Sequence, residues 1–295
     1  MPQVSIASDT STETAASSRG ALTAAQRATI LIVGLELLLL YAPTVRWLFE
    51  RWTLSVWHNA HGLLLVPVVG YLVYKELRPL ASLPWASNAW GFAILIPALG
   101  LIALDAGMHT ELLSAISLVA ALPGLSLLLL GSTRTRAILF PLGLLVFSLP
   151  IPLGVTETIH WQLRQVVVAV TAAVVPMLGI PVYAEGTTLH MARNSLEVAD
   201  ACSGFSTLYA ALAVACLTAY TTSSNSRRAL VLLAAAPIAI ASNMLRVILL
   251  VVLVVWRGQD ILHTFVHPLS GMLTFALALP VIFWLGGDPP RKAAA

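Results

Sequence analysis

The sequence predicts an all-α integral membrane protein with about eight transmembrane helices, one re-entrant or interfacial helix on the outer side, and a short extracytoplasmic loop resembling a β-hairpin. Three observations predict this fold class. Apolar residues make up 58% of the 295 residues, and charged residues only 10%, against roughly a quarter in an ordinary soluble domain. The apolar residues are gathered in long runs, and most charged residues lie between them. A soluble globule could not hide so much apolar surface, because a domain of this size still exposes much of its surface to water.

The chain divides into one long apolar part and two short polar ends. Residues 1–26 are rich in serine, threonine and alanine, which predicts a disordered cytoplasmic tail because such a segment buries too little apolar surface to fold. They hold no short apolar stretch with a small-residue cleavage site, so no signal peptide is expected. Residues 27–287 are expected to form a single polytopic membrane domain, and residues 288–295 a short cytoplasmic tail.

Apolar runs define the expected helices, since a helix needs about 20 apolar residues to cross the hydrocarbon core. The runs cover approximately residues 28–48, 60–74, 89–106, 112–131, 137–153, 166–180, 202–220, 229–255 and 266–285. The run at 166–180 is the weakest, because it has only about 15 residues and carries Pro176 and Gly179 near its end.

Basic residues predict the orientation, because they collect on the cytoplasmic side of a membrane. Arg19 and Arg27 precede the first run and place the N-terminus inside. Four further basic pairs all fall inside only if one run does not cross. These pairs are Lys75 with Arg78, Arg134 with Arg136, Arg227 with Arg228, and Arg291 with Lys292. We therefore interpret residues 155–180 as the outer re-entrant or interfacial helix, with eight crossing helices and both termini cytoplasmic.

One substantial polar segment, residues 181–199, lies away from the termini. Gly186 sits between stretches with partial alternation of apolar and polar residues, which is typical of a short β-hairpin. The segment leads directly into Asp200-Ala201-Cys202-Ser203-Gly204. In the expected topology both lie on the outer side of the membrane.

The net charge of +3 does not predict a nucleic-acid partner, because the basic residues are scattered singly or in pairs as the positive-inside rule produces them. The lipid bilayer is the expected partner. All seven histidines fall outside or at the outer interface in this topology. Such clustering would suit an extracytoplasmic active site, and interfacial anchoring by individual histidines is the alternative.

Arg246 is the first candidate for chemistry, because it interrupts the apolar run from Ala229 to Val255. An arginine inside a span costs at least roughly 2.5–3.5 kcal/mol on insertion scales, and such residues usually face a cavity or a partner. Asn243 precedes it by three residues and is expected on the same helical face. The alternative is a structural arginine that snorkels or pairs with a carboxylate.

Cys202 is the second candidate, with Asp200 as the expected N-cap of the helix that follows. A thiol in the first turn of a helix has a lowered pKa, because the helix dipole and the unbonded N–H groups favour the thiolate. The alternative is a small buried apolar residue, an interpretation that suits Cys216 in the middle of its apolar run. The two cysteines lie 14 residues apart in one run, which is too far along a helix for a disulfide.

His263 and His267 are spaced four residues apart, as in a zinc-binding pair on a helix. No glutamate follows the first histidine, so the H-E-x-x-H metalloprotease motif is absent from this sequence. A zinc protease that uses both, with His58 or His61, remains the less favoured alternative, and no metal or cofactor is predicted. The sharper hypothesis makes His267 the general acid or base for Cys202, because a thiol nucleophile needs an imidazole partner.

Cys202, Arg246 and His267 are expected at the outer ends or in the outer half of three different helices. A water-filled notch in the outer leaflet could join them. In such a site Cys202 would attack an amide carbonyl, His267 would transfer protons, and Arg246 would stabilise the oxyanion.

Several motifs, taken in order, resemble the exosortase/archaeosortase family of multi-pass membrane cysteine proteases or transpeptidases, over most of the chain after residue 25. The motifs are Trp57-His58-Asn59-Ala60-His61-Gly62, Phe140-Pro141-Leu142-Gly143 with Leu149-Pro150-Ile151-Pro152, Gly179-Ile180-Pro181-Val182-Tyr183 with Glu185-Gly186, Leu196-Glu197-Val198-Ala199-Asp200-Ala201-Cys202-Ser203-Gly204, Asn243-Met244-Leu245-Arg246, and His267-Pro268-Leu269-Ser270-Gly271.

The resemblance implies that Cys202, Arg246 and His267 are the catalytic residues. Supporting candidates from the matching motifs are Asn243, His61, Asp200, Ser203 and Gly204. It further implies substrates that are exported proteins tethered in the membrane by a C-terminal sorting signal, made of a PEP-type motif, a transmembrane helix and a basic tail. The family cuts at the outer face of the bacterial inner membrane and is often linked to exopolysaccharide genes.

The sequence departs from the usual family pattern at two positions. Neither departure changes one of the three catalytic residues, but both leave the subfamily open. Ala60 stands where the family usually has serine, and Pro268 follows His267. A polytopic transporter or a polysaccharide-export component is the main alternative function, with Arg246 on a substrate or proton path. That alternative gives Cys202 no role. The substrate motif, the acceptor nucleophile and the oligomeric state are left open by the sequence.

Overall fold

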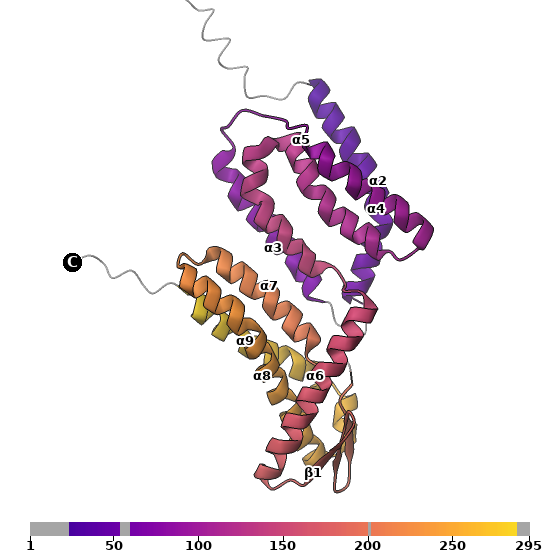
Figure 1. Cartoon of the computed structure of the whole chain (residues 1–295), viewed down its shortest axis with the longest axis vertical. Helices are drawn as coiled ribbons and strands as arrows, with labels where there is room; N and C mark the ends of the chain where they lie inside the picture. Colours follow the sequence, from indigo (N-terminus) through magenta and orange to yellow (C-terminus); the bar gives the residue numbers. More distant parts are fainter. Residues whose placement is uncertain (1–23, 54–59, 200–201, 288–295) are drawn as a thin grey trace, which may run out of the picture. The chain divides into compact units, whose positions relative to one another are not determined.

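The computed structural model describes residues 24–53, 60–199 and 202–287, most of which are helical (Figure 1). The two expected tails therefore lie almost wholly outside the described residues. The sequence predicts one domain over residues 27–287. The packing groups the chain into two compact units, of which one comprises residues 1–50 and 64–149 and the other residues 51–63 and 150–295.

The first unit is built from long apolar helices. Its elements are α2 (Ala24–Thr53), α3 (His61–Leu77), η1 (Arg78–Leu80), α4 (Gly91–Met108), α5 (Leu112–Leu144) and η2 (Leu145–Ser148), where the last residues of α2 and the first of α3 belong to the second unit. Gly91 of α4 and Gly124 of α5 let these two helices approach closely. A Cβ at Gly91 would lie 2.5 Å from the carbonyl oxygen of Gly124, so a side chain there would force the helices apart.

Gly131 breaks α5 into two helical stretches, because its backbone (φ 77°, ψ 173°) is not helical. The break lies between the predicted runs 112–131 and 137–153. Arg134 follows it and is buried, with its guanidinium donating to three backbone carbonyls within residues 80–84 at 2.6–3.1 Å. The guanidinium also lies 5.0 Å from the ring of Trp85. This basic residue therefore ties the 78–90 connection to α5.

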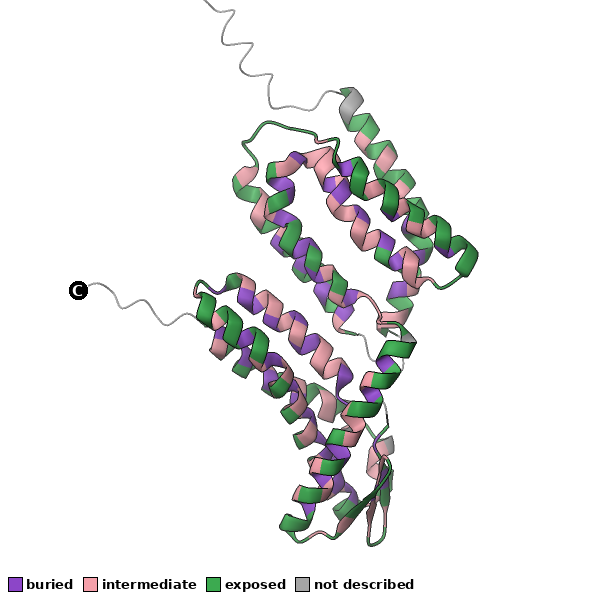
Figure 2. Cartoon of the chain, viewed as in Figure 1, coloured by how far each residue is buried: buried purple, intermediate pink, exposed green. Residues whose placement is uncertain are grey.

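The second unit combines helices with a small sheet. Its elements are α6 (Leu153–Val174), η3 (Val175–Leu178), β1 (Val182–Glu185), β2 (Thr188–Met191), β3 (Ser195–Glu197), α7 (Phe205–Thr221), α8 (Asn225–Arg257), η5 (Gln259–His263) and α9 (Val266–Gly286). Helices α7, α8 and α9 pack side by side (Figure 1). Among the candidate membrane spans, α8 has the largest buried share, and its buried residues can be followed in Figure 2.

The polar segment at 181–199 forms a three-stranded antiparallel sheet in the order β1-β2-β3. Tyr183 pairs with His190 across the first two strands, and Leu189 pairs with Leu196 across the second two. The leucine pair is buried and joins α6 and α8 in one apolar core, which also contains Cys202. On the sheet face opposite the leucine pair, the rings of Tyr183 and His190 stack with their centroids 4.9 Å apart. The sheet thus delivers the chain from α6 to the cysteine.

Six helical segments of the described residues are long and apolar enough to cross a membrane. They are Arg27–Thr53, Gly91–Met108, Leu112–Ser148, Gly154–Leu178, Asn225–Arg257 and Leu269–Gly286. Helix α7 is also apolar but shorter. The chain is therefore a multi-pass membrane protein.

The helix that contains the short apolar run at residues 166–180 is longer than that run, because it begins earlier, so shortness alone does not exclude a crossing. Helix α6 starts at Leu153, and Gly154–Leu178 spans 25 residues. Polar residues such as Glu157 and His160 interrupt the apolar pattern of α6 without ending the helix. Its hydropathy is the lowest of the six segments.

Candidate active site

Cys202 lies in a turn before α7, which we call the Cys202 turn (residues 202–204). Helix α7 begins at Phe205, and Gly204 is its N-cap with a left-handed backbone (φ 87°, ψ 4°). The prediction that Cys202 sits in the first helical turn is therefore wrong. The left-handed conformation at Gly204 separates the cysteine from the helix axis. Asp200, the expected N-cap, lies outside the described residues.

Backbone hydrogen bonds hold Cys202 from two sides. Its N–H donates to the carbonyl of Ala199 at 2.8 Å, and its carbonyl accepts a hydrogen bond from Nδ2 of Asn243 at 2.9 Å. The side chain is only 5% exposed and joins the apolar core formed with the sheet and α8. Cys202 is thus fixed at the point where the sheet, α7 and α8 meet.

The acidity of Cys202 is set by two opposing effects. Burial raises the pKa of the Cys202 thiol above its ordinary value, and the positive charge of Arg246 lowers it by a smaller amount. The net pKa is raised, so the predicted lowering is wrong. Placement outside the helix removes the first-turn geometry on which that prediction rested, and burial in the core favours the uncharged thiol.

Arg246 lies in α8 and is 6% exposed. Its Nε donates to Oγ of Ser270 in α9 at 3.0 Å. A Cβ on the neighbouring Gly271 would lie 3.3 Å from Cζ of Arg246, so the guanidinium packs directly against the α9 backbone. The structure therefore places the charge that the sequence singled out between α8 and α9, close enough to Cys202 to influence its ionisation.

Asn243 lies one turn before Arg246 on α8 and is 1% exposed. Within the described part of the chain, its Oδ1 has no hydrogen-bond partner, although its Nδ2 holds the carbonyl of Cys202. It also touches Gly204, where an added Cβ would lie only 2.6 Å from its Cγ. Asn243 and Gly204, both supporting candidates from the sequence, thus meet at the Cys202 turn.

His267 is the second residue of α9, three residues before Ser270. The side chains of His267, His263 and His58 lie outside what the structure describes. Backbone placement brings His267 to the helix that Arg246 contacts. The zinc alternative and the general-base hypothesis both depend on these side chains, and both stay predictions.

His160 is a residue beside the Cys202 turn that sequence reasoning missed. It lies on α6, is 4% exposed, and has its Nδ1 2.6 Å from Oγ of Ser203. Its ring lies 4.7 Å from that of Phe205. His160 and Ser203 are 43 residues apart in the sequence, so neither helix nor strand periodicity could indicate that they are in contact. The only hint was its place among the histidines assigned to the outer side.

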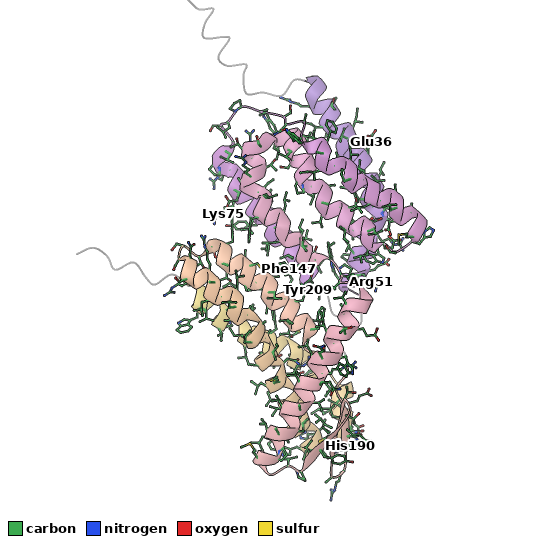
Figure 3. The ribbon with its side chains drawn as sticks, in the orientation of Figure 1. Glu36, Arg51, Lys75, Phe147, His190 and Tyr209 are labelled. Atoms are coloured by element: carbon green, nitrogen blue, oxygen red, sulfur yellow. The ribbon has the colours of Figure 1, made fainter. Side chains whose placement is uncertain are left out.

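His61, another supporting candidate, packs against α7. Its ring makes an edge-to-face contact with Tyr209 at 5.3 Å, and Tyr209 stacks with Phe205 at 6.0 Å. Figure 3 labels Tyr209 on α7. An aromatic row of His61, Tyr209, Phe205 and His160 therefore leads along the start of α7 to Ser203.

The raised pKa of Cys202 predicts slow alkylation at neutral pH. In a Cys216→Ala background, the rate of iodoacetamide labelling should keep rising with pH and reach half its maximum above the ordinary thiol value of about 8.5. Arg246→Gln should move the midpoint higher still, because it removes the charge that lowers the pKa of Cys202. Mass spectrometry of the labelled protein between pH 6 and 11 measures this. A midpoint below the ordinary thiol value would contradict the balance of burial and charge.

A buried thiol beside a fixed guanidinium, on a turn anchored by an asparagine, can support nucleophilic chemistry at a carbonyl. The model of the family described as transmembrane exosortase (Exosortase_EpsH) matches residues 52–284. Comparisons with the curated proteins and with the solved structures found no match. The matched region covers more than half of the chain and contains every candidate residue above, and the predicted resemblance is confirmed. The chain belongs to the transmembrane exosortase family.

Proposed function

We propose that this protein is a membrane-embedded cysteine protease or transpeptidase that cleaves the C-terminal sorting signal of exported proteins. The signal would comprise a PEP-type motif, a transmembrane helix and a basic tail. Family membership supports a transpeptidase related to protein sorting. The observation that carries the proposal is that buried Arg246 acts electrostatically on buried Cys202, while Asn243, one turn before Arg246 on α8, holds the carbonyl of Cys202.

The proposed roles follow from the chemistry of each side chain. Cys202 is the nucleophile, His267 the general acid and base, and Arg246 the group that stabilises negative charge on the oxyanion. Because burial keeps the thiol protonated, His267 has to accept the thiol proton as the sulfur attacks. Asn243, Ser203 and Gly204 support the turn, and Asp200 and His61 remain candidates at its edges.

The proposed reaction proceeds in two acyl-transfer steps. Sγ of Cys202 bonds to the carbonyl carbon of the scissile peptide while its proton passes to His267. The tetrahedral intermediate then collapses, the C–N bond breaks, and His267 returns the proton to the leaving amine. An acceptor amine or water next attacks the thioester carbonyl and releases the thiol of Cys202. Arg246 stabilises the oxyanion in both steps, in surroundings poor in water where such charge interactions are strong.

The proposed topology keeps eight crossing helices, both termini in the cytoplasm and the site at the outer face of the bacterial inner membrane. The distribution of basic residues supports it. Helix α6 is the one proposed to lie at the outer side without crossing, since it is the least apolar of the six candidate spans. A substrate tethered by one helix diffuses in the membrane plane, so a site in the outer leaflet can receive the bond just above that helix.

Replacing Cys202 tests the proposed function directly. Cells that express the full chain with a PEP-tailed reporter should process the reporter, and Cys202→Ala should abolish processing, by on the order of 10⁴-fold or more, because the nucleophile is gone. Cys202→Ser should behave almost as badly, since a buried hydroxyl is a weaker nucleophile. Immunoblotting of the reporter's mobility measures the ratio of processed to full-length protein.

Cys216→Ala is the matched control, because Cys216 lies within α7 away from the turn. It should process the reporter like the wild type. Unchanged processing by Cys202→Ala would contradict the thiol mechanism. Processing that survives this change but stops with a chelator would instead favour the zinc alternative. No processing by any variant at normal abundance would favour a transporter or an export component.

A further inference from the structure

We propose that His160 is a positioning residue for the nucleophile, acting through Ser203 to hold the Cys202 turn in its reactive place. This inference rests on the proposed function, because it assigns a role within the same site. It concerns a residue that belongs to none of the sequence motifs and lies on α6, a different element from those that carry Cys202, Arg246 and His267.

The contact between the two side chains is short and shielded from water. Nδ1 of His160 lies 2.6 Å from Oγ of Ser203, and the two residues are 4% and 1% exposed. A buried polar pair of this kind is strongly maintained, because removing one partner leaves the other without its hydrogen bond in a dry site. The bond therefore ties α6 to the residue immediately after the nucleophile.

A second hydrogen bond holds the same hydroxyl. The backbone N–H of Phe205 donates to Oγ of Ser203 at 3.3 Å. The hydroxyl is therefore held both by the ring of His160 and by the backbone at the start of α7. A serine oxygen carries one proton and two lone pairs, so the tautomer of His160 sets whether Nδ1 or Oγ donates.

Three separate elements then hold the Cys202 turn. Ala199, in the chain that leaves the sheet, accepts a hydrogen bond from the N–H of Cys202. Asn243 of α8 donates to the carbonyl of Cys202. His160 of α6 is hydrogen-bonded to the side chain of the next residue, Ser203. The first two contacts hold the Cys202 peptide, and the third holds the side chain of the residue that follows it. Ser203 can rotate only by giving up its hydrogen bond to His160.

The aromatic row gives His160 its own fixed orientation. The ring of His160 is tilted by 46° against Phe205, whose ring stacks on Tyr209. Tyr209 in turn contacts His61. A histidine packed in this way presents Nδ1 in one direction, as a positioning residue must. A misplacement of the nucleophile by about 1 Å can cost on the order of 10²-fold in rate.

The test compares two isosteric changes at His160 in the full chain, purified in lipid nanodiscs with a PEP-tailed helical peptide as substrate. Asparagine can place either its carboxamide oxygen or its nitrogen near the position of Nδ1, so it can accept from or donate to Oγ of Ser203, whereas glutamine places its carboxamide near Nε2. His160→Gln and Ser203→Ala should each lower kcat by about tenfold or more with KM within about twofold. His160→Asn should retain kcat within about threefold. His190→Gln, a matched change on β2, should leave kcat unaltered.

The double variant His160→Gln/Ser203→Ala adds a test of coupling. Because both changes remove the same hydrogen bond, the double variant should lose no more than the worse single variant, rather than the product of the two losses. Iodoacetamide labelling of Cys202 in the Cys216→Ala background provides a readout that needs no substrate. The labelling rate should change in His160→Gln and Ser203→Ala and should return toward wild type in His160→Asn.

The outcomes separate this inference from the proposed function. If the wild type does not cleave the peptide, or Cys202→Ala still does, the proposed function fails, whatever the labelling shows. If the wild type cleaves and His160→Gln and Ser203→Ala match it in kcat and labelling, the positioning role is overturned. Losses that follow protein abundance equally in all His160 variants, asparagine included, would overturn it too, because they would mark a purely structural residue.

Discussion

Arg246→Gln should lower kcat for cleavage of the sorting signal by about 10²–10³-fold while the protein remains folded in the membrane. Removal of a group that stabilises an oxyanion typically has an effect of this size. Arg246 is 6% exposed, so its charge acts in surroundings where water screens it little. Burst-phase kinetics with a PEP-tailed peptide in nanodiscs would show the loss in the acylation step.

Folding should survive this change, because it removes a charge that is costly to bury in a span and keeps a polar side chain at the position. Arg246→Lys should recover part of the rate, since lysine restores the charge but not the planar fork that spans two acceptors. Arg257→Gln is the matched control, because Arg257 is the exposed last residue of the same helix. Cleavage by Arg246→Gln at the wild-type rate would contradict the oxyanion role.

The anchoring of Arg246 explains why its placement could be predicted only in part from sequence. Its isolation in an apolar run identified it as a candidate, and hydropathy assigned it to a long helix, which α8 confirms. Its partner Ser270 and the close backbone of Gly271 belong to α9. Helix periodicity describes one helix at a time and carries no information on which helix faces it.

The Cys202 turn shows where local sequence rules give a wrong result. Asp200 before an apolar run resembles an N-cap, and the rule places the cysteine inside the helix. The glycine at 204 takes the left-handed conformation instead, and α7 starts one residue later. The pKa of Cys202 is then raised instead of lowered, because Cys202 is buried in a core formed by α6, the sheet and α8. This core brings Cys202 together with residues as distant in sequence as Val167 and Val251.

Helix α6 and His160 illustrate the same limit in a different way. The hydropathy of α6 identified only its second half, because Glu157, His160 and Arg164 interrupt the first half. Those polar residues include the one that reaches Ser203. Residue patterns and the family resemblance both singled out Cys202, Asn243 and Arg246, which lie in ordered motifs, whereas His160 belongs to none of them.

Gly204→Ala should reduce kcat by at least about 10²-fold, because the added methyl group disturbs the residue that holds the nucleophile. An L-residue in the left-handed conformation at φ 87° is disfavoured by about 1–2 kcal/mol. Beyond this strain, the new Cβ would lie 2.6–2.8 Å from Cγ, Nδ2 and Cβ of Asn243. Asn243 must then move, and its hydrogen bond to the carbonyl of Cys202 is lost with it.

Gly179→Ala separates backbone strain from this collision. Gly179 has almost the same conformation (φ 80°, ψ 11°), but a Cβ there meets nothing within 4 Å. Both alanine variants should therefore lower the thermal midpoint in nanodiscs, Gly204→Ala the more because of its added collision, while only Gly204→Ala should lose kcat. If Gly179→Ala loses as much activity as Gly204→Ala, strain alone is the cause and the Asn243 contact is unimportant.

Removing Asn243 tests the same contact from its other side. Asn243→Ala should lower kcat because the Cys202 carbonyl loses its donor. Asn243→Ala removes Cγ and Nδ2 from the collision and leaves only Cβ of residue 243, which would lie 2.8 Å from the new methyl group. The double variant should therefore lose much less than the product of the two single losses. Independent effects would instead multiply. A loss well below that product would mean that Gly204 is required chiefly to let α8 hold the Cys202 turn at contact distance.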